Sequence, residues 1–274
     1  MPELPEVETI RRTLEPYLVG CRIENIEIYY GGIIKKPEPV VFIKQASGQI
    51  IRDIKRRGKY LLIQLGDEYT LVIHLRMTGQ LTISDRNTAV AKHTHLIFRL
   101  DNGKELRFTD IRKFGMVYLI PAGEWHEAGG LAGLGPEPLN DEFTADCLCE
   151  IIKGKKGKLK AFLLDQTRIA GIGNIYADEI MFEAGLAPQR TIETLSRQEI
   201  GQLYAAIRAK LQEGIEYQGT SIRDYVNGLG EKGGFQHRLK VYDCAGQPCA
   251  RCGTMLVKTT VCGRGTVFCP QCQR

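Results

Sequence analysis

The chain begins Met-Pro-Glu, which places the secondary amine of Pro2 beside the carboxylate of Glu3 once the initiator Met1 is removed. A chain-terminal amine has a pKa of roughly 8, so part of it is neutral and nucleophilic near physiological pH without burial. Amines attack carbonyl-like carbons to form Schiff bases, and a neighbouring carboxylate can move the protons that this step requires. Pro2 and Glu3 are therefore a candidate catalytic pair.

The same residues also fit a helix start. Pro5 suits the first helical position, and Glu6 and Glu8 suit the positive end of the helix dipole. Apolar residues then recur at helical spacing, so the sequence predicts a helix over residues 5–19 that ends at Gly20. On local signals alone, this structural interpretation is favoured over the catalytic one.

The C-terminal segment carries residues with metal chemistry. Two C-x2-C pairs are separated by sixteen residues, and in a chain without a secretion signal this spacing indicates metal binding rather than disulfides. Four thiolates without histidine form a closed tetrahedral site, which is typical of structural rather than catalytic zinc. The predicted ligands are Cys249, Cys252, Cys269 and Cys272, whereas Cys21, Cys147, Cys149, Cys244 and Cys262 show no pattern.

Length and charge narrow the class of protein. At 274 residues the chain is long enough for two domains, or three if one is small. The net charge is +5, and basic residues gather at 52–59 and 153–160. Such runs are usually solvated faces, but two of them favour a polyanionic partner about equally. No apolar run could span a bilayer and no signal peptide is visible, so we expect no membrane association and a cytoplasmic protein.

The elements that must position these groups change character along the chain. Up to about residue 120, short β-rich runs alternate with Gly, Asp and Asn turns. Several short strands at this spacing predict a β-sandwich with the first helix packed against it. The runs start near Ile23 and continue as Tyr60–Ile63, Leu71–Ile73, Leu96–Phe98 and Val117–Ile120.

A Gly- and Pro-rich stretch at 134–139 predicts a linker after an N-terminal domain of residues 1–133. The period then becomes helical, which predicts a helical domain over residues 140–218. Within it, a glycine-rich turn before Asn174 exposes backbone N–H groups that can bind phosphate. The helix candidates are residues 143–153, 157–166, 175–185 and 196–217.

The last part of the chain is a loop followed by the cysteine module. Residues 219–238 are polar and glycine-rich, which predicts a long functional loop. Residues 239–274 hold the cysteines and a β-hairpin with Arg264 at its tip. Together with the basic clusters, this hairpin favours a nucleic-acid-binding protein.

The motifs taken together resemble one family, the bacterial formamidopyrimidine-DNA glycosylases, which remove 8-oxoguanine and ring-opened purines from DNA. The resemblance runs from the first residue to the last. It implies an α+β multidomain fold: an N-terminal β-sandwich with flanking helices, a helix–two-turn–helix domain and a C-terminal zinc-finger β-hairpin with four cysteine ligands. The matching motifs are Met1–Glu8, His74–Met77, Asp110–Gly115, Gly173–Tyr176 and the cysteine module.

The resemblance also implies a mechanism. Pro2 would attack C1′ of the damaged nucleotide and form a Schiff base to the opened sugar, while Glu3 shuttles protons and Lys59 contacts the phosphate. The iminium would then allow β- and δ-elimination, which makes the protein a bifunctional DNA glycosylase and AP lyase. This chemistry needs no redox cofactor or catalytic metal, only one structural zinc ion, and a monomer is expected.

DNA contacts follow from the same resemblance. A base inside a duplex must be flipped out before it can react, and Met77, Arg112 and Phe114 match the residues that fill the hole. The 219–238 segment matches a loop that closes over the everted base, with backbone N–H groups offered by Thr220, Ser221, Ile222, Arg223, Asp224 and Tyr225. The remaining predicted DNA-binding residues are His74, His93, Lys160, Asn174 and Arg264.

Two alternatives stay open. Endonuclease VIII-type enzymes share the fold but prefer oxidised pyrimidines, typically begin Pro-Glu-Gly-Pro-Glu and lack the Arg-x-Phe pair. Leu4 and the Arg112–Phe114 segment favour the purine-specific branch. The second alternative is a DNA-binding protein on the same scaffold without catalysis, which retention of Met1 would favour.

Overall fold

The computed structural model describes residues 2–274; the expected removal of Met1 therefore lies outside the described residues. The chain forms two compact units. The first combines Met1–Ala132 with Tyr217–Gly234, and the second combines Gly133–Glu216 with Phe235–Arg274. Within residues 2–274, no helix has the length and apolar character needed to cross a membrane.

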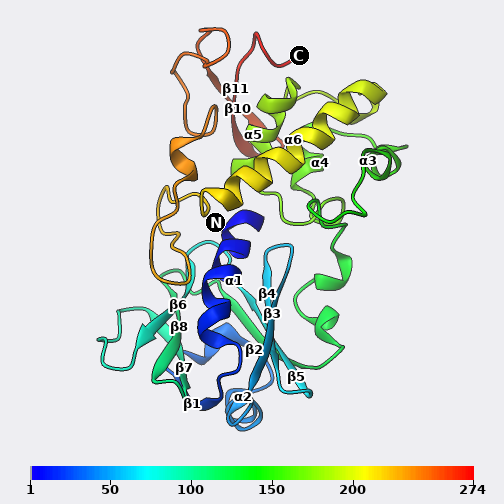
Figure 1. The fold of residues 1–274 in the computed structure, drawn as a ribbon. Coiled ribbons are helices and arrows are strands. Elements are labelled where there is room, and N and C mark those ends of the chain that lie inside the picture. The colour runs from blue at the N-terminus through cyan, green and yellow to red at the C-terminus, as the bar shows by residue number, and fades with distance from the viewer. Residues whose placement is uncertain (1) are drawn as a thin grey trace. The chain divides into compact units, whose positions relative to one another are not determined.

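Helix α1 (Leu4–Leu18) starts directly after Glu3, close to the predicted bounds. Glu3 is the N-cap residue, and its N–H donates to Glu6 Oε2 at 2.8 Å, as in a capping box. Helix α1 lies against the strands of the first unit (Figure 1), and its apolar residues belong to the core of that unit. The helix ends before Gly20, whose φ of +88° suits a residue without a side chain.

In the described part of the first unit, nine strands form two sheets, which confirms the predicted sandwich. One sheet has the order β1 (Ile23–Ile28), β7 (Thr94–Leu100), β8 (Lys104–Asp110), β6 (Gly79–Asp85). The other has the order β2 (Ile34–Lys36), β9 (Met116–Pro121), β5 (Tyr69–His74), β4 (Tyr60–Leu65), β3 (Ile51–Arg57). The unit also contains α2 (Pro39–Ala46) and the short 3-10 helices η1 (Gly31–Ile33) and η2 (Trp125–Glu127).

Two chain connections cross between the sheets at the same end of the sandwich. The chain passes from β5 to β6 and later from β8 to β9. Because β6 pairs with β8 and β5 pairs with β9, Gly79 lies opposite Asp110 and His74 lies opposite Met116. The connections 75–78 and 111–115 must therefore lie side by side.

The basic cluster at 52–59 was interpreted above either as a solvated face or as a contact for a polyanion. The first interpretation is corrected here, because the cluster is not uniformly exposed. Most of it is strand β3, which was not among the predicted strands. The Arg56 side chain is nearly buried and donates to Glu8 Oε2 of α1 at 3.2 Å. Burial alone would raise the pKa of Glu8, but hydrogen bonds and ion pairs with Arg11, Arg12 and Arg56 lower it overall. This ion cluster attaches α1 to β3.

The second unit is helical with a C-terminal hairpin. Ser196 and Glu199 form the predicted capping box, with bonds of 2.8 Å from Ser196 N to Glu199 Oε2 and 3.3 Å from Glu199 N to Ser196 Oγ. Arg264 begins the second hairpin strand opposite Val261, so it stands beside the turn rather than at its tip. The elements are α3 (Ala145–Ile152), α4 (Leu159–Leu164), α5 (Asn174–Ala184), α6 (Arg197–Glu216), β10 (Val257–Val261) and β11 (Arg264–Phe268), with 3-10 helices at Ile192–Thr194 and Phe235–His237. A further 3-10 helix, Leu131–Gly133, begins in the first unit and ends at the first residue of the second.

Candidate active site

Pro2 and Glu3 are both buried at the start of α1, so the helix start and the candidate catalytic pair occupy the same place. The Glu3 carboxylate lies at the positive end of the helix dipole, which favours a negative charge. Glu6 is the residue that sequence reasoning missed here. Its Oε2 accepts the Glu3 N–H, and its Oε1 accepts the Thr220 N–H at 2.8 Å. One buried carboxylate thus joins the N-terminus to the 219–238 segment.

Within the predicted lesion loop, the residues expected to face the base, 220–225, are anchored at both ends. The Tyr225 hydroxyl donates to the Gln218 carbonyl at 3.0 Å, and burial next to Glu6 raises the pKa of Tyr225. The Ser221 hydroxyl donates to the Tyr225 carbonyl at 2.8 Å. The Thr220 N–H is bonded to Glu6, so the expectation that it is offered to a base is not met in this structure. Between these anchors, Ile222 and Arg223 are exposed and Asp224 is half-buried.

Lys59 lies in the two-residue turn between β3 and β4 and is largely buried. Arg56 Nη1 donates to the Gly58 carbonyl at 3.1 Å, so the ion cluster around Glu8 also fixes this turn. The ion pair between Arg56 and Glu8 therefore sets the position of Lys59 relative to α1. The sequence had indicated a helix-dipole role for Glu8 and had placed Arg56 in a basic cluster.

His74 is buried at the end of β5. Burial, together with the charges of Arg76 and Lys59, lowers the pKa of His74 to about 3. Its Nδ1 accepts the Arg76 N–H at 2.9 Å, so the proton of the neutral ring is on Nε2. In this structure the His74 ring is therefore neutral near pH 7. His93 is half-buried with φ of +71°, and its carbonyl accepts the Asp110 N–H at 3.0 Å.

The three predicted insertion residues form one exposed cluster. Met77 is 44% exposed and Phe114 is 51% exposed, so neither is a core residue. The Arg112 guanidinium lies 4.6 Å from the centre of the Phe114 ring, and its Nη1 lies 3.0 Å from Met77 Sδ. The Phe114 ring and the Met77 thioether thus hold the guanidinium of Arg112, which places a polar group between two exposed apolar side chains.

In the second unit, Lys160, which was predicted to contact a DNA phosphate, lies buried in this structure. Its side chain is 0% exposed, and its Nζ lies 2.7 Å from each of three acceptors: Asp178 Oδ1, the Gly265 carbonyl and Thr266 Oγ1. An ammonium has three N–H groups, and these contacts use all of them. Burial raises the pKa of Asp178 to about 6 although Lys160 opposes this shift.

Asn174 and Arg264 lie close to the same carbonyl group. Asn174 begins α5, and its Nδ2 donates to the Gly265 carbonyl at 3.1 Å. Among the described residues, its Oδ1 is buried without a hydrogen-bond partner. Arg264, directly before Gly265, is exposed. Lys160 and Asn174 therefore hold the hairpin at the residue that follows its exposed arginine.

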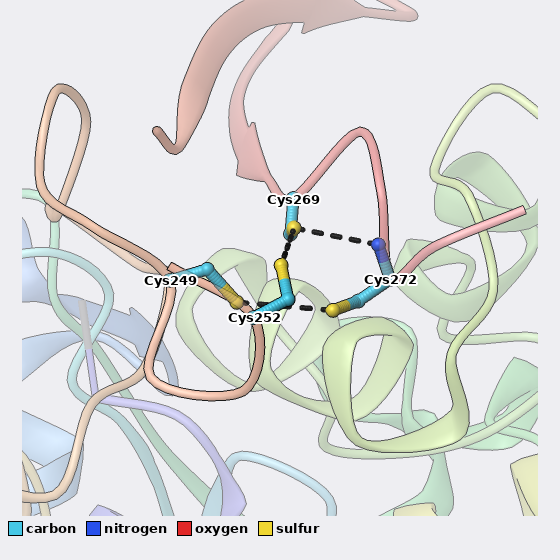
Figure 2. A group of neighbouring side chains, drawn as sticks. All are labelled: Cys249, Cys252, Cys269 and Cys272. Carbon is cyan, nitrogen blue, oxygen red and sulfur yellow. Dashed lines mark hydrogen bonds between the residues drawn. The ribbon is translucent and has the colours of Figure 1, made fainter. Parts of the chain in front are cut away.

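The four predicted metal ligands converge. Their sulfur atoms all lie within 4.8 Å of one another (Figure 2). Two of the distances are 3.9 Å, from Cys249 to Cys272, and 3.5 Å, from Cys252 to Cys269. Tetrahedral zinc with Zn–S bonds of about 2.3 Å requires sulfur–sulfur distances of about 3.8 Å. The four cysteines therefore fit one structural zinc ion.

Known proteins match the chain along its length. Residues 1–117 match the model of the formamidopyrimidine-DNA glycosylase N-terminal domain, and residues 134–226 match that of the formamidopyrimidine-DNA glycosylase H2TH domain. Residues 246–274 match a zinc finger found in FPG and IleRS. The chain belongs to the formamidopyrimidine-DNA glycosylase family.

Individual members of the formamidopyrimidine-DNA glycosylase family are similar over the whole chain. The formamidopyrimidine-DNA glycosylase of Carboxydothermus hydrogenoformans is 49% identical over 275 residues, covering 100% of both chains. That of Pelotomaculum thermopropionicum is 46% identical over 274 residues, covering 100% of this chain and 99% of the relative. A mutant of the Lactococcus lactis enzyme, in complex with Fapy-dG-containing DNA, superposes with a TM-score of 0.93 at 38% identity, covering 100% of both chains.

Proposed function

We propose that this protein is a base-excision repair enzyme that removes oxidised purines from duplex DNA and then cleaves the abasic site. The observation that carries the proposal is the position of Pro2: it is next to Glu3 at the start of α1, and Glu6 connects this helix start to the predicted lesion loop. Relatives support the substrate class, since the Lactococcus lactis enzyme has been solved with Fapy-dG DNA and with abasic-site DNA.

The proposed chemistry begins at the Pro2 nitrogen, which needs Met1 to be removed. The nitrogen attacks C1′ and passes its N–H proton to the Glu3 carboxylate, while the C1′–base bond breaks and the base leaves with the electron pair and takes up a proton from solvent. Glu3 delivers a proton to the sugar ring oxygen as the ring opens, which leaves an iminium ion between Pro2 and C1′. The iminium acidifies the C2′ proton, so the 3′ phosphate leaves by β-elimination and the 5′ phosphate by δ-elimination. Lys59 binds the phosphate next to the damaged sugar.

The lesion reaches Pro2 by base flipping. Met77 and Phe114 are the exposed apolar groups that fill the gap in the duplex, and Arg112 meets the acceptors of the orphaned cytosine. His74 and His93 are assigned to contacts near this gap, and the exposed loop residues Ile222 and Arg223 to the everted base.

The second unit binds the DNA backbone. We assign this role to Asn174 and to the exposed Arg264, with Lys160 as the group that positions both through the Gly265 carbonyl. Bound zinc would hold the four cysteines and thereby the hairpin. In this assignment residues 1–133 are the catalytic domain, 134–139 a linker, 140–218 the DNA-binding domain, 219–238 the lesion loop and 239–274 the zinc finger. The protein acts as a monomer.

Oxidised pyrimidines are the second candidate substrate class. A Lactococcus lactis relative has also been solved with DNA containing an oxidised pyrimidine. The Arg112–Phe114 pair nevertheless favours purines, because it matches the purine-specific branch. Excision from matched duplexes with 8-oxoguanine or an oxidised pyrimidine separates the two classes by their rates.

Borohydride trapping tests the mechanism. The protein is incubated with a duplex carrying 8-oxoguanine opposite cytosine, and the reduced Schiff base is detected as a covalent adduct. We expect an adduct for the wild type and a much lower yield for Pro2→Gly, which keeps a chain-terminal amine but loses the proline ring, with Glu3→Gln blocked in base release. An adduct that persists unchanged in both variants would refute the assigned roles. Intact mass showing Met1 retained, with no adduct, would instead favour a non-catalytic DNA-binding protein.

A further inference from the structure

Asp110 is a fully buried carboxylate at the end of β8, where the connection that carries Arg112 and Phe114 begins. A buried carboxylate is costly unless hydrogen bonds compensate for the lost water. Asp110 has no part in the chemistry proposed above, so its burial needs another explanation. Its bonding partners supply one.

Each carboxylate oxygen of Asp110 holds a different point of the two crossing connections. Oδ2 accepts the Gly115 N–H at 2.7 Å. Oδ1 accepts the Arg112 N–H at 3.1 Å and also the hydroxyl of Thr78, the residue after Met77. The Thr78 hydroxyl in turn lies 3.2 Å from the Arg112 nitrogen. One side chain thus fixes both ends of the 112–115 turn and joins it to the connection that carries Met77.

The surroundings fit Asp110 closely. A Cβ atom added to Gly115 would lie 2.4 Å from the Phe108 ring and 3.2 Å from Asp110 Oδ2. His95 Nε2 lies 2.7 Å from the Asp110 carbonyl oxygen, which fixes the backbone at the same residue. The backbone that carries the exposed side chains of Met77, Arg112 and Phe114 is therefore closely packed and hydrogen-bonded.

We propose that Asp110 and Thr78 are positioning residues for strand insertion: they hold Met77, Arg112 and Phe114 as one preformed wedge. This inference rests on the proposed function, because it assumes that the three exposed residues enter the duplex. A preformed wedge enters a base step without first paying to order two independent loops. Its loss slows eversion of the lesion but leaves the reaction of Pro2 with an already accessible sugar unchanged.

The test compares two substrates in the full-length, zinc-bound protein. The first is a duplex with 8-oxoguanine opposite cytosine, followed under single-turnover conditions. The second is a single-stranded oligonucleotide with a preformed abasic site, followed by borohydride trapping, in which no base has to be everted. The variants are Asp110→Asn, which places an NH2 group against one of the N–H donors, and Thr78→Val, which removes the hydroxyl at equal size. Asp67→Asn, an exposed carboxylate in the turn after β4, is the matched control.

For Asp110→Asn we expect base excision from the duplex to slow by about 10- to 100-fold, the range for losing a hydrogen bond to a charged group. Thr78→Val slows it by a smaller factor, and Thr78→Ser restores it. Trapping on the single strand stays within about twofold of the wild type for all variants. Wild-type excision in both Asp110→Asn and Thr78→Val would overturn the proposal, as would an equal loss on both substrates in a folded variant. If Asp110→Asn does not fold, the comparison of Thr78→Val with Thr78→Ser on the two substrates decides whether the proposal holds. Failure of the wild type to trap the abasic site would instead overturn the proposed function.

Discussion

Replacing Lys160 by Met separates a structural role from a DNA contact, because the two roles predict opposite results. The side chain is 0% exposed and its ammonium bonds Asp178, Gly265 and Thr266 at 2.7 Å each. Lys160→Met leaves the Asp178 carboxylate buried without its cation. Breaking a buried ion pair in this way costs about 3–5 kcal/mol. We expect the free energy of unfolding of the zinc-bound protein to fall by that amount.

The assay combines urea unfolding with DNA affinity measured over a series of salt concentrations. A lysine or arginine that contacts a phosphate contributes about 0.9 to the slope of log affinity against log salt. Arg264→Ala, at an exposed site, should lower this slope by about 0.9 and change stability by less than about 0.5 kcal/mol. Lys160→Met should leave the slope unchanged once the protein is folded.

A double variant provides the internal control. In Lys160→Met with Asp178→Asn, the buried charge is removed, while the amide oxygen still accepts the Val267 N–H that Asp178 Oδ2 accepts at 3.1 Å. Stability should recover by at least half of the loss, since an uncharged pair replaces a lone buried carboxylate. A salt slope lowered by about one in Lys160→Met, with stability intact, would refute the structural role and restore Lys160 as a phosphate contact.

Three further outcomes follow from the site. The pKa of His74 is lowered to about 3, so between pH 6.5 and 3 only the unfolded chain binds a proton at this residue. The stability contributed by the neutral ring is therefore complete above pH 6.5 and is lost as the pH falls, by about 2 kcal/mol at pH 5. In urea unfolding measured over this pH range, His74→Gln should lack this loss. Glu6→Gln replaces one accepting oxygen by a donor facing the N–H of Glu3 or Thr220, so limited proteolysis should cleave the 219–238 segment faster while the far-UV spectrum stays unchanged. Removing zinc with a chelator should unfold residues 246–274 and lower DNA affinity, and unchanged affinity would contradict the binding role of the hairpin.

Sequence pattern predicted the elements whose signal is local. Helix α1, the capping box at Ser196 and the four zinc ligands each depend on residues within one short segment, and the sandwich was predicted from short apolar runs that are each local. Strands β2, β3, β6 and β8 were not identified, because charged and polar residues interrupt their apolar positions. Burial of those strands is decided by the neighbouring strand and not by their own composition.

The contacts around the predicted site residues are likewise set by parts of the chain far away in the sequence. Lys160 stands in a run of lysines that indicates a solvated face, and only the fold shows that its partners come from 18 and 106 residues away. Glu6 accepts from Thr220, 214 residues further along the chain, and no local pattern marks such a contact. Residue type gave the chemistry of Pro2, Glu3 and the cysteines, whereas the groups that position them depend on tertiary contacts.

The cluster of Met77, Arg112 and Phe114 shows that strand order brings together residues whose sequence spacing does not predict a contact. Met77 and Arg112 are 35 residues apart, yet their side chains touch because both connections leave the sandwich at one end. Hydrophobic pattern places Met77 and Phe114 in a core, and their exposure becomes understandable only once the strand order is known. The proposed positioning role gives the buried carboxylate of Asp110 a physical reason: hydrogen bonds to the backbone beneath an exposed apolar cluster favour one arrangement of that cluster.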